Sequence, residues 1–394
     1  MKHRDIERAE QLMDAYLDDL KTIVNIDSGT FTKAGVDRVA AYLQERFQGL
    51  GFSTRFDQQE HYGDHLVATH QGNAPGGPRI LLIGHIDTVL PDGEAGRRPF
   101  AISRHDGARI ATGPGILDMK SGVLIGMYAL HLLIEGQQAN YSQVTFICNS
   151  DEEIGSPSSR PLIQQLAQQA DAVLVLEPGR AQGTIVSSRK GCGQYRVEVH
   201  GLSAHAGVEP QHGRNAILEL SYQVQKMQAL NGTIPGATLS VGIIRGGERT
   251  NVVPDYAYFD MDVRVADQAS LKALEEAMRQ VTHQNKLAGT RITLNGSLLC
   301  QPFERNQHNE QLVALAKEAG RELGVKIQDV GSGGASDANT TAAMAIPTLD
   351  GLGAGGGLAH NPGEYIELDY LPTRIALAAG LIRKLANKYG GDKP

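Results

Sequence analysis

The sequence predicts a mixed α/β fold, mostly a parallel sheet flanked by helices, with an inserted ferredoxin-like α+β domain. From Asp5 to Glu177, near-continuous aliphatic runs alternate with helical patterns, which is typical of a βαβ sheet. Near Ser188 the strand patterns become alternately apolar and polar. After Gln301 the alternation of aliphatic runs with helical patterns returns. We expect a first domain made of residues 1–187 and 300–394, and an inserted domain at residues 188–299.

The first domain opens with an amphipathic helix. Residues 80–84 and 172–176 are almost entirely aliphatic, so we expect both to be short parallel strands buried on both faces. The apolar run at residues 144–148 adds another core strand. Helical periodicity covers residues 36–51 and 121–136, and these helices would flank the sheet.

The inserted domain follows the order β-α-β-β-α-β, which is that of the ferredoxin-like sandwich, a sheet with two helices on one face. Its expected elements are residues 194–200, 215–230, 238–244, 256–265, 270–286 and 291–294. The chain then completes the first domain with a helix at 309–324, a strand at 346–349 and a closing helix at 371–388.

Length and composition limit the function. With 394 residues, 41% of them hydrophobic, the chain can bury a large core and form two domains. A formal charge of −7 and a pI near 6.0, without a run of lysines and arginines, argue against nucleic-acid binding. No apolar segment approaches the roughly 20 residues that span a bilayer, so we expect a cytoplasmic protein without a membrane partner.

The cysteines predict little chemistry. Cys148, Cys192 and Cys300 are far apart and form no Cys-x-x-Cys motif. We therefore expect neither a disulfide framework nor a thiolate zinc site, but small buried side chains.

Titratable groups stand where the apolar runs end. Three adjacent carboxylates follow the run at 144–148, and such crowding needs a cation or a proton-transfer role to offset the repulsion. A weaker run leads in the same way into residues 113–118. Sites in open α/β sheets form beyond the carboxyl ends of the strands, where these groups would meet. The groups are His85, Asp87, Asp118, Asp151, Glu152, Glu153 and Glu177.

Taken singly, these residues have ordinary explanations. His85 could be a core histidine, and Glu152 and Glu153 could open a helix, where carboxylates favour the first turn. Taken together, a histidine with carboxylates and no thiolates suits Zn²⁺ or a similar divalent ion. Two-metal hydrolytic sites hold their ions roughly 3.5–4 Å apart and need a bridging carboxylate, for which Asp118 is the natural candidate.

A glycine-rich segment at residues 351–357 formally contains G-x-G-x-x-G. A dinucleotide-binding motif must open a helix, whereas here Leu358 to Pro362 follows and blocks one. We therefore do not expect a nucleotide cofactor.

A series of short motifs occurs in order along the chain. They are His85–Thr88, Gly113–Lys120, Asp151–Ser156, Glu177–Pro178, Ser203–Gly207, Asn251–Pro254, Asp262–Arg264 and His360. In this order and spacing they resemble the glutamate carboxypeptidase and aminoacylase family of two-zinc exopeptidases. The resemblance covers nearly the whole chain, and the segments at 113–122 and 151–156 are most similar to the carboxypeptidase G-like branch.

The resemblance implies a site for two Zn²⁺ ions per subunit. His85 and Glu177 would hold one ion, Glu153 and His360 the other, and Asp118 would bridge them. Two Zn²⁺ ions, three carboxylates and a bridging hydroxide sum to zero charge. Co²⁺ or Mn²⁺ could take the place of zinc, because the ligand set tolerates all three.

The resemblance also implies roles for residues beside the ions. Glu152 would be the general base that activates the zinc-bridging water. Asp87 would orient the imidazole of His85, and the peptide bond between Asp118 and Met119 would be cis.

The inserted domain would serve for dimerisation and as a lid. The resemblance implies that His205 stabilises the oxyanion from the partner subunit, which makes the protein a homodimer. Asn251 and Arg264 would grip the substrate, and the Arg264 guanidinium suits a free carboxylate. A hinge at residues 187–191 is one interpretation of that segment, and a rigid turn is the other.

We thus predict a two-zinc exopeptidase or amidohydrolase that cleaves the amide bond to a C-terminal amino acid, such as glutamate, in a small peptide or N-acyl amino acid. The alternatives within the family are an N-acyl amino acid deacylase and a di- or tripeptidase. A non-catalytic binding protein is disfavoured by the intact Glu152. A serine hydrolase is disfavoured because no Gly-x-Ser-x-Gly elbow occurs.

Overall fold

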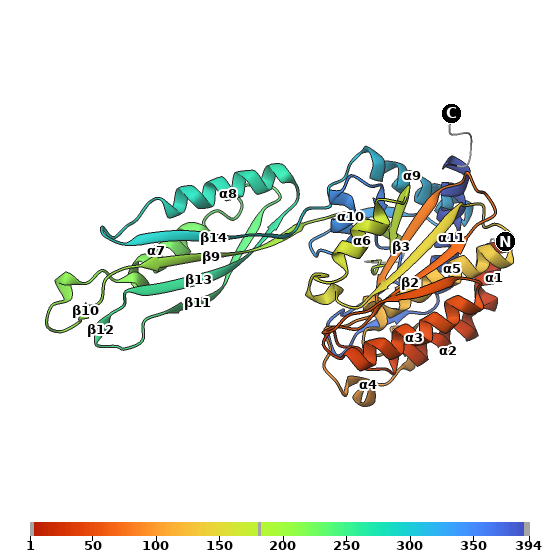
Figure 1. The fold of residues 1–394 in the computed structure, drawn as a ribbon, viewed down its shortest axis with the longest axis horizontal. Helices are drawn as coiled ribbons and strands as arrows, with labels where there is room; N and C mark the ends of the chain where they lie inside the picture. The colour runs from red at the N-terminus through yellow and green to blue at the C-terminus, as the bar shows by residue number, and fades with distance from the viewer. Residues whose placement is uncertain (1–3, 180–182, 390–394) are drawn as a thin grey trace. The chain divides into compact units, whose positions relative to one another are not determined.

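The computed structural model describes residues 4–179 and 183–389, which form two compact units. The first unit comprises the chain up to residue 188, residues 305–331 and the chain from residue 336 onward. The second comprises residues 189–304 and 332–335. The chain thus leaves the first unit and later returns to it, as the colour gradient in Figure 1 shows.

The first unit is built on a six-stranded mixed sheet of order β1-β2-β6-β3-β7-β16. Strand β3 lies in its middle and runs parallel to β6 and β7 on either side. Strand β16 is also parallel, whereas β2 and β1 pair in antiparallel fashion, which confirms the mixed, mostly parallel prediction. The strands are β1 (Ser53–Asp57), β2 (His65–Gln71), β3 (Arg79–His85), β6 (Gln143–Asn149), β7 (Ala172–Val175) and β16 (Thr348–Leu349).

Helices enclose this sheet and supply most of the core. Helix α3 (Lys33–Gly49) packs on β1 and β2, and α5 (Ser121–Glu135) packs on β3. Helix α11 (Leu371–Tyr389) packs on α5, on α9 (Gln307–Glu322) and on α1 (Arg4–Gln11), so the last described helix lies beside the first (Figure 1). The remaining helices of this unit are α2 (Met13–Val24), α4 (Glu94–Arg97), α6 (Arg160–Ala167) and α10 (Asp337–Ala343).

Helix α5 is unusually apolar. With the turn before it, residues Ile116–Glu135 are long and apolar enough to cross a membrane by length and composition, so the expectation that no apolar segment reaches this length was wrong. In the structure 89% of the most apolar window is buried inside the protein. Within the described part of the chain this is the one such segment, and its burial shows that it is a core helix.

A second, antiparallel sheet in the first unit has the order β17-β18-β5-β4. Its strands are β4 (Ala101–His105), β5 (Ala108–Thr112), β17 (Gly356–Gly357) and β18 (Tyr365–Glu367). The weak apolar run before residue 113 therefore does not belong to the main sheet. Strand β5 is buried only at Ile110 and Ala111, so it lacks the continuous aliphatic character of a central parallel strand.

The second unit has the predicted β-α-β-β-α-β order. Its four strands pair in antiparallel fashion in the order β11-β13-β9-β14, which is the ferredoxin-like arrangement. Figure 1 shows α7 and α8 beside this sheet, and their apolar residues share its core. The elements are β9 (Gly191–His200), α7 (Ala216–Gln228), β11 (Thr238–Gly246), β13 (Tyr256–Val265), α8 (Gln268–Thr282) and β14 (Arg291–Cys300).

The cysteine prediction was wrong for one pair. Cys192 and Cys300 form a disulfide, with Cα atoms 5.3 Å apart, while Cys148 is free and buried. The two residues lie opposite each other in the β9–β14 register. The two cysteines are 108 residues apart in the sequence, and only the strand pairing brings them together.

Candidate metal centre

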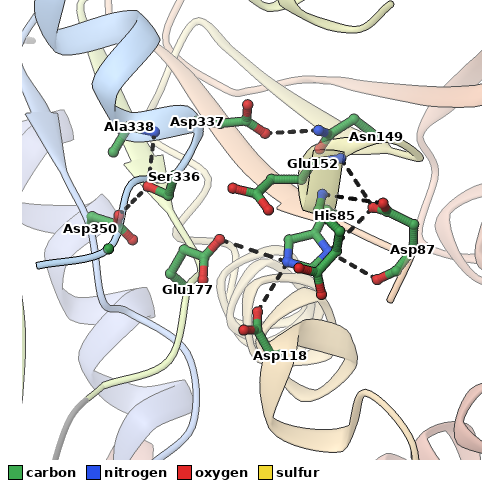
Figure 2. A network of polar contacts seen from close by, with 12 residues as sticks. His85, Asp87, Asp118, Asn149, Glu152, Glu177, Ser336, Asp337, Ala338 and Asp350 are labelled. Carbon is green, nitrogen blue, oxygen red and sulfur yellow. Dashed lines mark hydrogen bonds and ion pairs between the residues drawn. The ribbon is translucent and has the colours of Figure 1, made fainter. Parts of the chain in front are cut away.

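Three parallel strands deliver side chains to one edge of the main sheet. His85 is the last residue of β3, Glu152 and Glu153 form a short 3₁₀ turn after β6, and Glu177 follows β7. Because β3 lies between β6 and β7, their carboxyl ends are adjacent. The strands thus bring these groups to one edge of the sheet, where Figure 2 shows His85, Glu152 and Glu177 close together.

Two further groups arrive from outside the sheet. Asp118 lies in the turn between β5 and α5, where Gly115 adopts a left-handed φ of 67°. The peptide bond between Asp118 and Met119 is cis, as predicted. His360 lies in the loop between β17 and β18 and also has a positive φ.

These side chains form two groups that share Asp118. His85 Nε2 lies 3.1 Å from Asp118 Oδ1 and 3.7 Å from Glu177 Oε1 (Figure 2). His360 Nε2 lies 3.2 Å from Asp118 Oδ2 and 3.2 Å from Glu153 Oε2. Two ligands bonded to one tetrahedral zinc ion are about 3.3 Å apart, so both groups have the spacing that such an ion requires. Because each Asp118 oxygen faces a different histidine, this carboxylate can bridge two ions.

Asp87 fixes the tautomer of His85. The backbone carbonyl of Asp87 accepts a hydrogen bond from His85 Nδ1 at 3.0 Å, and its carboxylate Oδ1 lies 3.4 Å from the same nitrogen. Since both partners can only accept, Nδ1 carries the proton. Nε2, which faces Asp118 and Glu177, is therefore the nitrogen that can give up its proton and bind a metal ion there.

The Asp87 carboxylate also holds the turn after β6. Its Oδ1 accepts the N–H of Glu152 at 3.2 Å, and its Oδ2 accepts the N–H of Glu153 at 3.3 Å. The hydroxyl of Thr30 donates to Oδ2 at 2.7 Å. One fully buried carboxylate thus connects the histidine of one ligand group to the backbone of the other.

The ligand groups concentrate opposite charges. Burial lowers the pKa of His85, but hydrogen bonds with Asp118 and Asp87 outweigh it and raise that pKa well above its ordinary value. Hydrogen bonds with Asp118 and Glu153 raise the pKa of His360 to about 10. Burial raises the pKa of Asp118, yet its bonds to both imidazoles leave it lowered. The site therefore favours bound positive charge. Divalent ions that bind the imidazole nitrogens of His85 and His360 would displace the protons on them.

Glu152 belongs to neither ligand group. Its side chain projects among His85, Glu177 and Asp337 (Figure 2). Burial, and then the charge of Glu177, raise the pKa of its carboxyl well above the ordinary value. The residue keeps partial access to solvent, so the site has a carboxyl beside the ligand groups that is available for other chemistry.

The model of peptidase family M20/M25/M40 matches residues 81–384 of the chain. The protein belongs to this family. Carboxypeptidase G2 from Pseudomonas sp. (strain RS-16) is 31% identical over 379 residues, covering 94% of this chain and 89% of that protein. The chain is therefore a metal-dependent hydrolase.

Solved structures share the fold of this chain. Aminopeptidase PepT from Bacillus cereus superposes with a TM-score of 0.80 at 24% identity, covering 94% of this chain and 98% of that one. YXEP from Bacillus subtilis, described as a dinuclear metal-binding peptidase of family M20, has a TM-score of 0.71 at 16% identity, with 96% and 99% covered. At these identities the likeness shows the fold.

The three adjacent carboxylates of this M20 peptidase lie in different environments. Asp151 is buried and accepts hydrogen bonds from Ser158 and Ser159, including Ser158 N–H at 2.6 Å. Asp151 is thus structural, whereas Glu153 faces His360 and Glu152 stays outside both ligand groups. The crowding at this turn therefore reflects separate tasks for the three side chains.

Sequence reasoning assigned no function to His65, which the structure places in the support of this turn. The fully buried ring accepts the N–H of Ser150 at Nδ1 (3.2 Å), and its Nε2 lies 3.0 Å from the hydroxyl of Ser158. Because Nδ1 accepts, Nε2–H donates to Ser158, whose hydroxyl donates to Asp151 at 2.7 Å. The sequence places His65 at the start of a strand, and nothing in that pattern predicts these hydrogen bonds.

Two buried carboxylates near the metal centre were also missed. Asp337 accepts hydrogen bonds from Asn149 at 2.7 Å and from Ser156 at 2.5 Å, and burial raises its pKa to about 6 (Figure 2). Glu364 accepts three backbone hydrogen bonds from the turn that carries Asp118. Neither residue follows a recognisable strand pattern, so periodicity could not find them.

The remaining predicted site residues lie in the second unit and are not all together. His205 is exposed on β10 (Ala204–His205), whose partner strand β12 (Val252–Val253) directly follows Asn251. Its Nδ1 accepts the N–H groups of residues 207 and 208, so its Nε2–H can donate.

Arg264 occupies the opposite end of β13 from these two residues. From Tyr256 to Arg264 the strand rises by about 26 Å, at 3.3 Å per residue. Its guanidinium binds both carboxylate oxygens of Asp262, at 2.9 and 3.0 Å. Within this unit, therefore, Arg264 cannot act at the same point as His205.

Proposed function

We propose that this protein is a two-zinc carboxypeptidase that hydrolyses the amide bond to a C-terminal amino acid. The observation that carries the proposal is Glu152, a carboxyl outside both ligand groups but beside His85 and Glu177, in a site where Asp118 can bridge two ions. A site that held two metal ions only to stabilise the fold would not need such a carboxyl. The similarity to carboxypeptidase G2 supports the choice of bond.

The bound ions would polarise the scissile carbonyl and the attacking water. Glu152 takes the proton of that water and delivers it to the leaving amine. Asp87 keeps the Nε2 lone pair of His85 directed at the ligand group and fixes the turn on which Glu152 stands. Zinc fits the nitrogen and oxygen donors and their spacing, and Co²⁺ or Mn²⁺ could use the same set.

We assign substrate recognition to Arg264 and Asn251. A guanidinium binds a carboxylate through two parallel hydrogen bonds, which suits the free C-terminus of a peptide. Asp262 already holds Arg264 in that geometry, so a substrate carboxylate would exchange with it. Both side chains of this pair are partly exposed, which makes the exchange accessible.

We further propose that the protein acts as a homodimer through the second unit. Strand β11 is an edge strand, and it exposes Ile243 and Ile244 at 50% and 56%. An open edge with adjacent exposed apolar residues favours pairing with a second copy. Because His205 and Asn251 lie away from Arg264, they would serve the site of the partner subunit.

The dimer proposal is tested with Ile244→Glu, which places a charge on this edge. We expect a monomer by light scattering, with an unchanged circular dichroism spectrum and at least tenfold lower activity. Ile102→Glu, at an exposed position of the first unit, is the matched control. A dimer that persists in Ile244→Glu would contradict this interface.

The catalytic proposal is tested with Glu152→Gln on a panel of dipeptides and N-acyl amino acids. We expect wild-type metal content and a loss of turnover of about 10³–10⁴-fold, while Glu135→Gln, an exposed glutamate, keeps full activity. Activity that survives a chelator, or near-normal turnover of Glu152→Gln, would overturn the proposal. Preference on the panel for an acyl group or a free N-terminus would instead favour the deacylase or the di- or tripeptidase alternative.

A further inference from the structure

Glu364 is a buried carboxylate that the proposed chemistry does not use. Only 2% of its surface is exposed. Its Oε2 accepts the N–H of Gly115 at 3.0 Å, and its Oε1 accepts the N–H groups of Leu117 at 2.7 Å and Asp118 at 2.8 Å. A single side chain thus binds three amides of the turn that carries the shared ligand.

The topology places this carboxylate between two metal ligands. Tyr365 pairs with Thr112 where β18 meets β5. The turn to Asp118 begins directly after Thr112, and the loop from His360 ends directly before Tyr365. The two segments diverge from one strand pair and meet again where Asp118 Oδ2 lies 3.2 Å from His360 Nε2. Glu364 joins them between these two points.

The two histidine ligands differ in how firmly they are held. His85 ends a central strand and is 1% exposed, whereas the side chain of His360 is 52% exposed and stands on a loop. The position of His360 relative to Asp118 therefore depends on contacts between its loop and the Asp118 turn. The three hydrogen bonds of Glu364 are such contacts.

We propose that Glu364 is a positioning residue that preorganises the second ion position, formed by Asp118, Glu153 and His360. This inference rests on the proposed two-metal function. Removing the Glu364 carboxylate weakens the second position more than the first, because the first depends on the Asp118 turn but not on the His360 loop. An ion held at the second position by misplaced ligands would also lower kcat, without raising KM.

The test is Glu364→Gln, which keeps the shape but turns an amide N–H toward backbone N–H groups. Zinc affinities are measured by competition with a chromophoric chelator, beside circular dichroism of the metal-free protein. We expect a second affinity lower by about 10–100-fold, the usual effect of losing a partner behind a ligand, and a first affinity that falls much less. Zinc content at limiting metal then falls from two ions toward one, and excess zinc restores turnover.

Asp369→Asn is the matched control. The carboxylate of Asp369 also accepts a backbone N–H on β5, that of Arg109 at 3.5 Å, but it lies at the surface. We expect this variant to bind both ions as the wild type does. The visible spectrum of the Co²⁺-loaded protein provides a second readout, because it reports the geometry of each position independently of activity.

The outcomes separate this inference from the proposed function. Wild-type protein that binds no divalent ion would overturn the function itself. Two ions bound with wild-type affinities by a folded Glu364→Gln would overturn only the role of Glu364, even if its thermal midpoint falls. Should Glu364→Gln not fold, Glu364→Asp keeps the charge but shortens the reach, and the same selective loss at the second position is expected; equal affinities there would overturn the role.

Discussion

Replacing Asp87 by asparagine tests the connection between the two ligand groups. The change keeps the size of the side chain but replaces one accepting oxygen with an N–H donor. In either orientation one backbone N–H of the turn after β6 loses its partner: Glu152 if the amide nitrogen takes the place of Oδ1, Glu153 if it takes the place of Oδ2. The hydroxyl of Thr30 can rotate to accept, but a backbone amide cannot.

The structure sets the expected magnitude. A buried donor without a partner costs about 1–3 kcal/mol, and loss of the charge weakens the other bonds, so the free energy of unfolding should fall by about 2–4 kcal/mol. Asp87 supports both the ligand His85 and the backbone of Glu152. If loss of each support costs about tenfold or more in activity, the combined loss in kcat/KM is about 10²–10³-fold.

The assay combines urea unfolding of the metal-free protein with steady-state kinetics at saturating zinc. Thr30→Val is the control, because it removes one hydrogen bond to the same carboxylate and leaves both amides paired. We expect it to cost about 1 kcal/mol in stability. The reasoning is refuted if Asp87→Asn unfolds at the wild-type midpoint and keeps kcat/KM within about threefold.

Two further predictions concern the histidines. In His360→Ala the content of tightly bound zinc should fall from two ions to one, because the ligand is half-exposed and its removal leaves the buried group of His85 intact; loss of both ions, or of neither, would contradict the two-group arrangement. Burial lowers the pKa of His65 below its ordinary value. As the pH falls through about 6.5, the unfolded chain therefore binds a proton that the folded protein does not, and stability falls. The unfolding free energy of His65→Gln, measured between pH 7 and 5, should depend less steeply on pH than that of the wild type, and identical slopes would refute this explanation.

The sequence predicted best where hydrophobic pattern and chain direction determine position. His85, Glu153 and Glu177 follow aliphatic runs, and the rule that parallel strands end at one edge predicts that they lie together. Asp118 was placed in the right site by a partly wrong argument, since β5 belongs to the small antiparallel sheet. Its position depends on a turn between β5 and α5 that periodicity does not describe.

Features that depend on pairing between distant segments could not be predicted. The register of β9 and β14 brings Cys192 beside Cys300, and no local pattern reports that register. Asp337 opens helix α10 and Glu364 lies in the loop before β18, and the burial of both is decided by the surrounding structure.

The order of the ligands along the chain has a consequence for biosynthesis. His85, Asp118 and Glu177 all precede the inserted unit, whereas His360 follows it. A nascent polypeptide emerging from the ribosome thus has every donor for its first cation before translation of the insertion begins. The second cation must wait until almost the whole message has been read, so no prematurely terminated product ending before residue 360 can hold the pair through this set of donors.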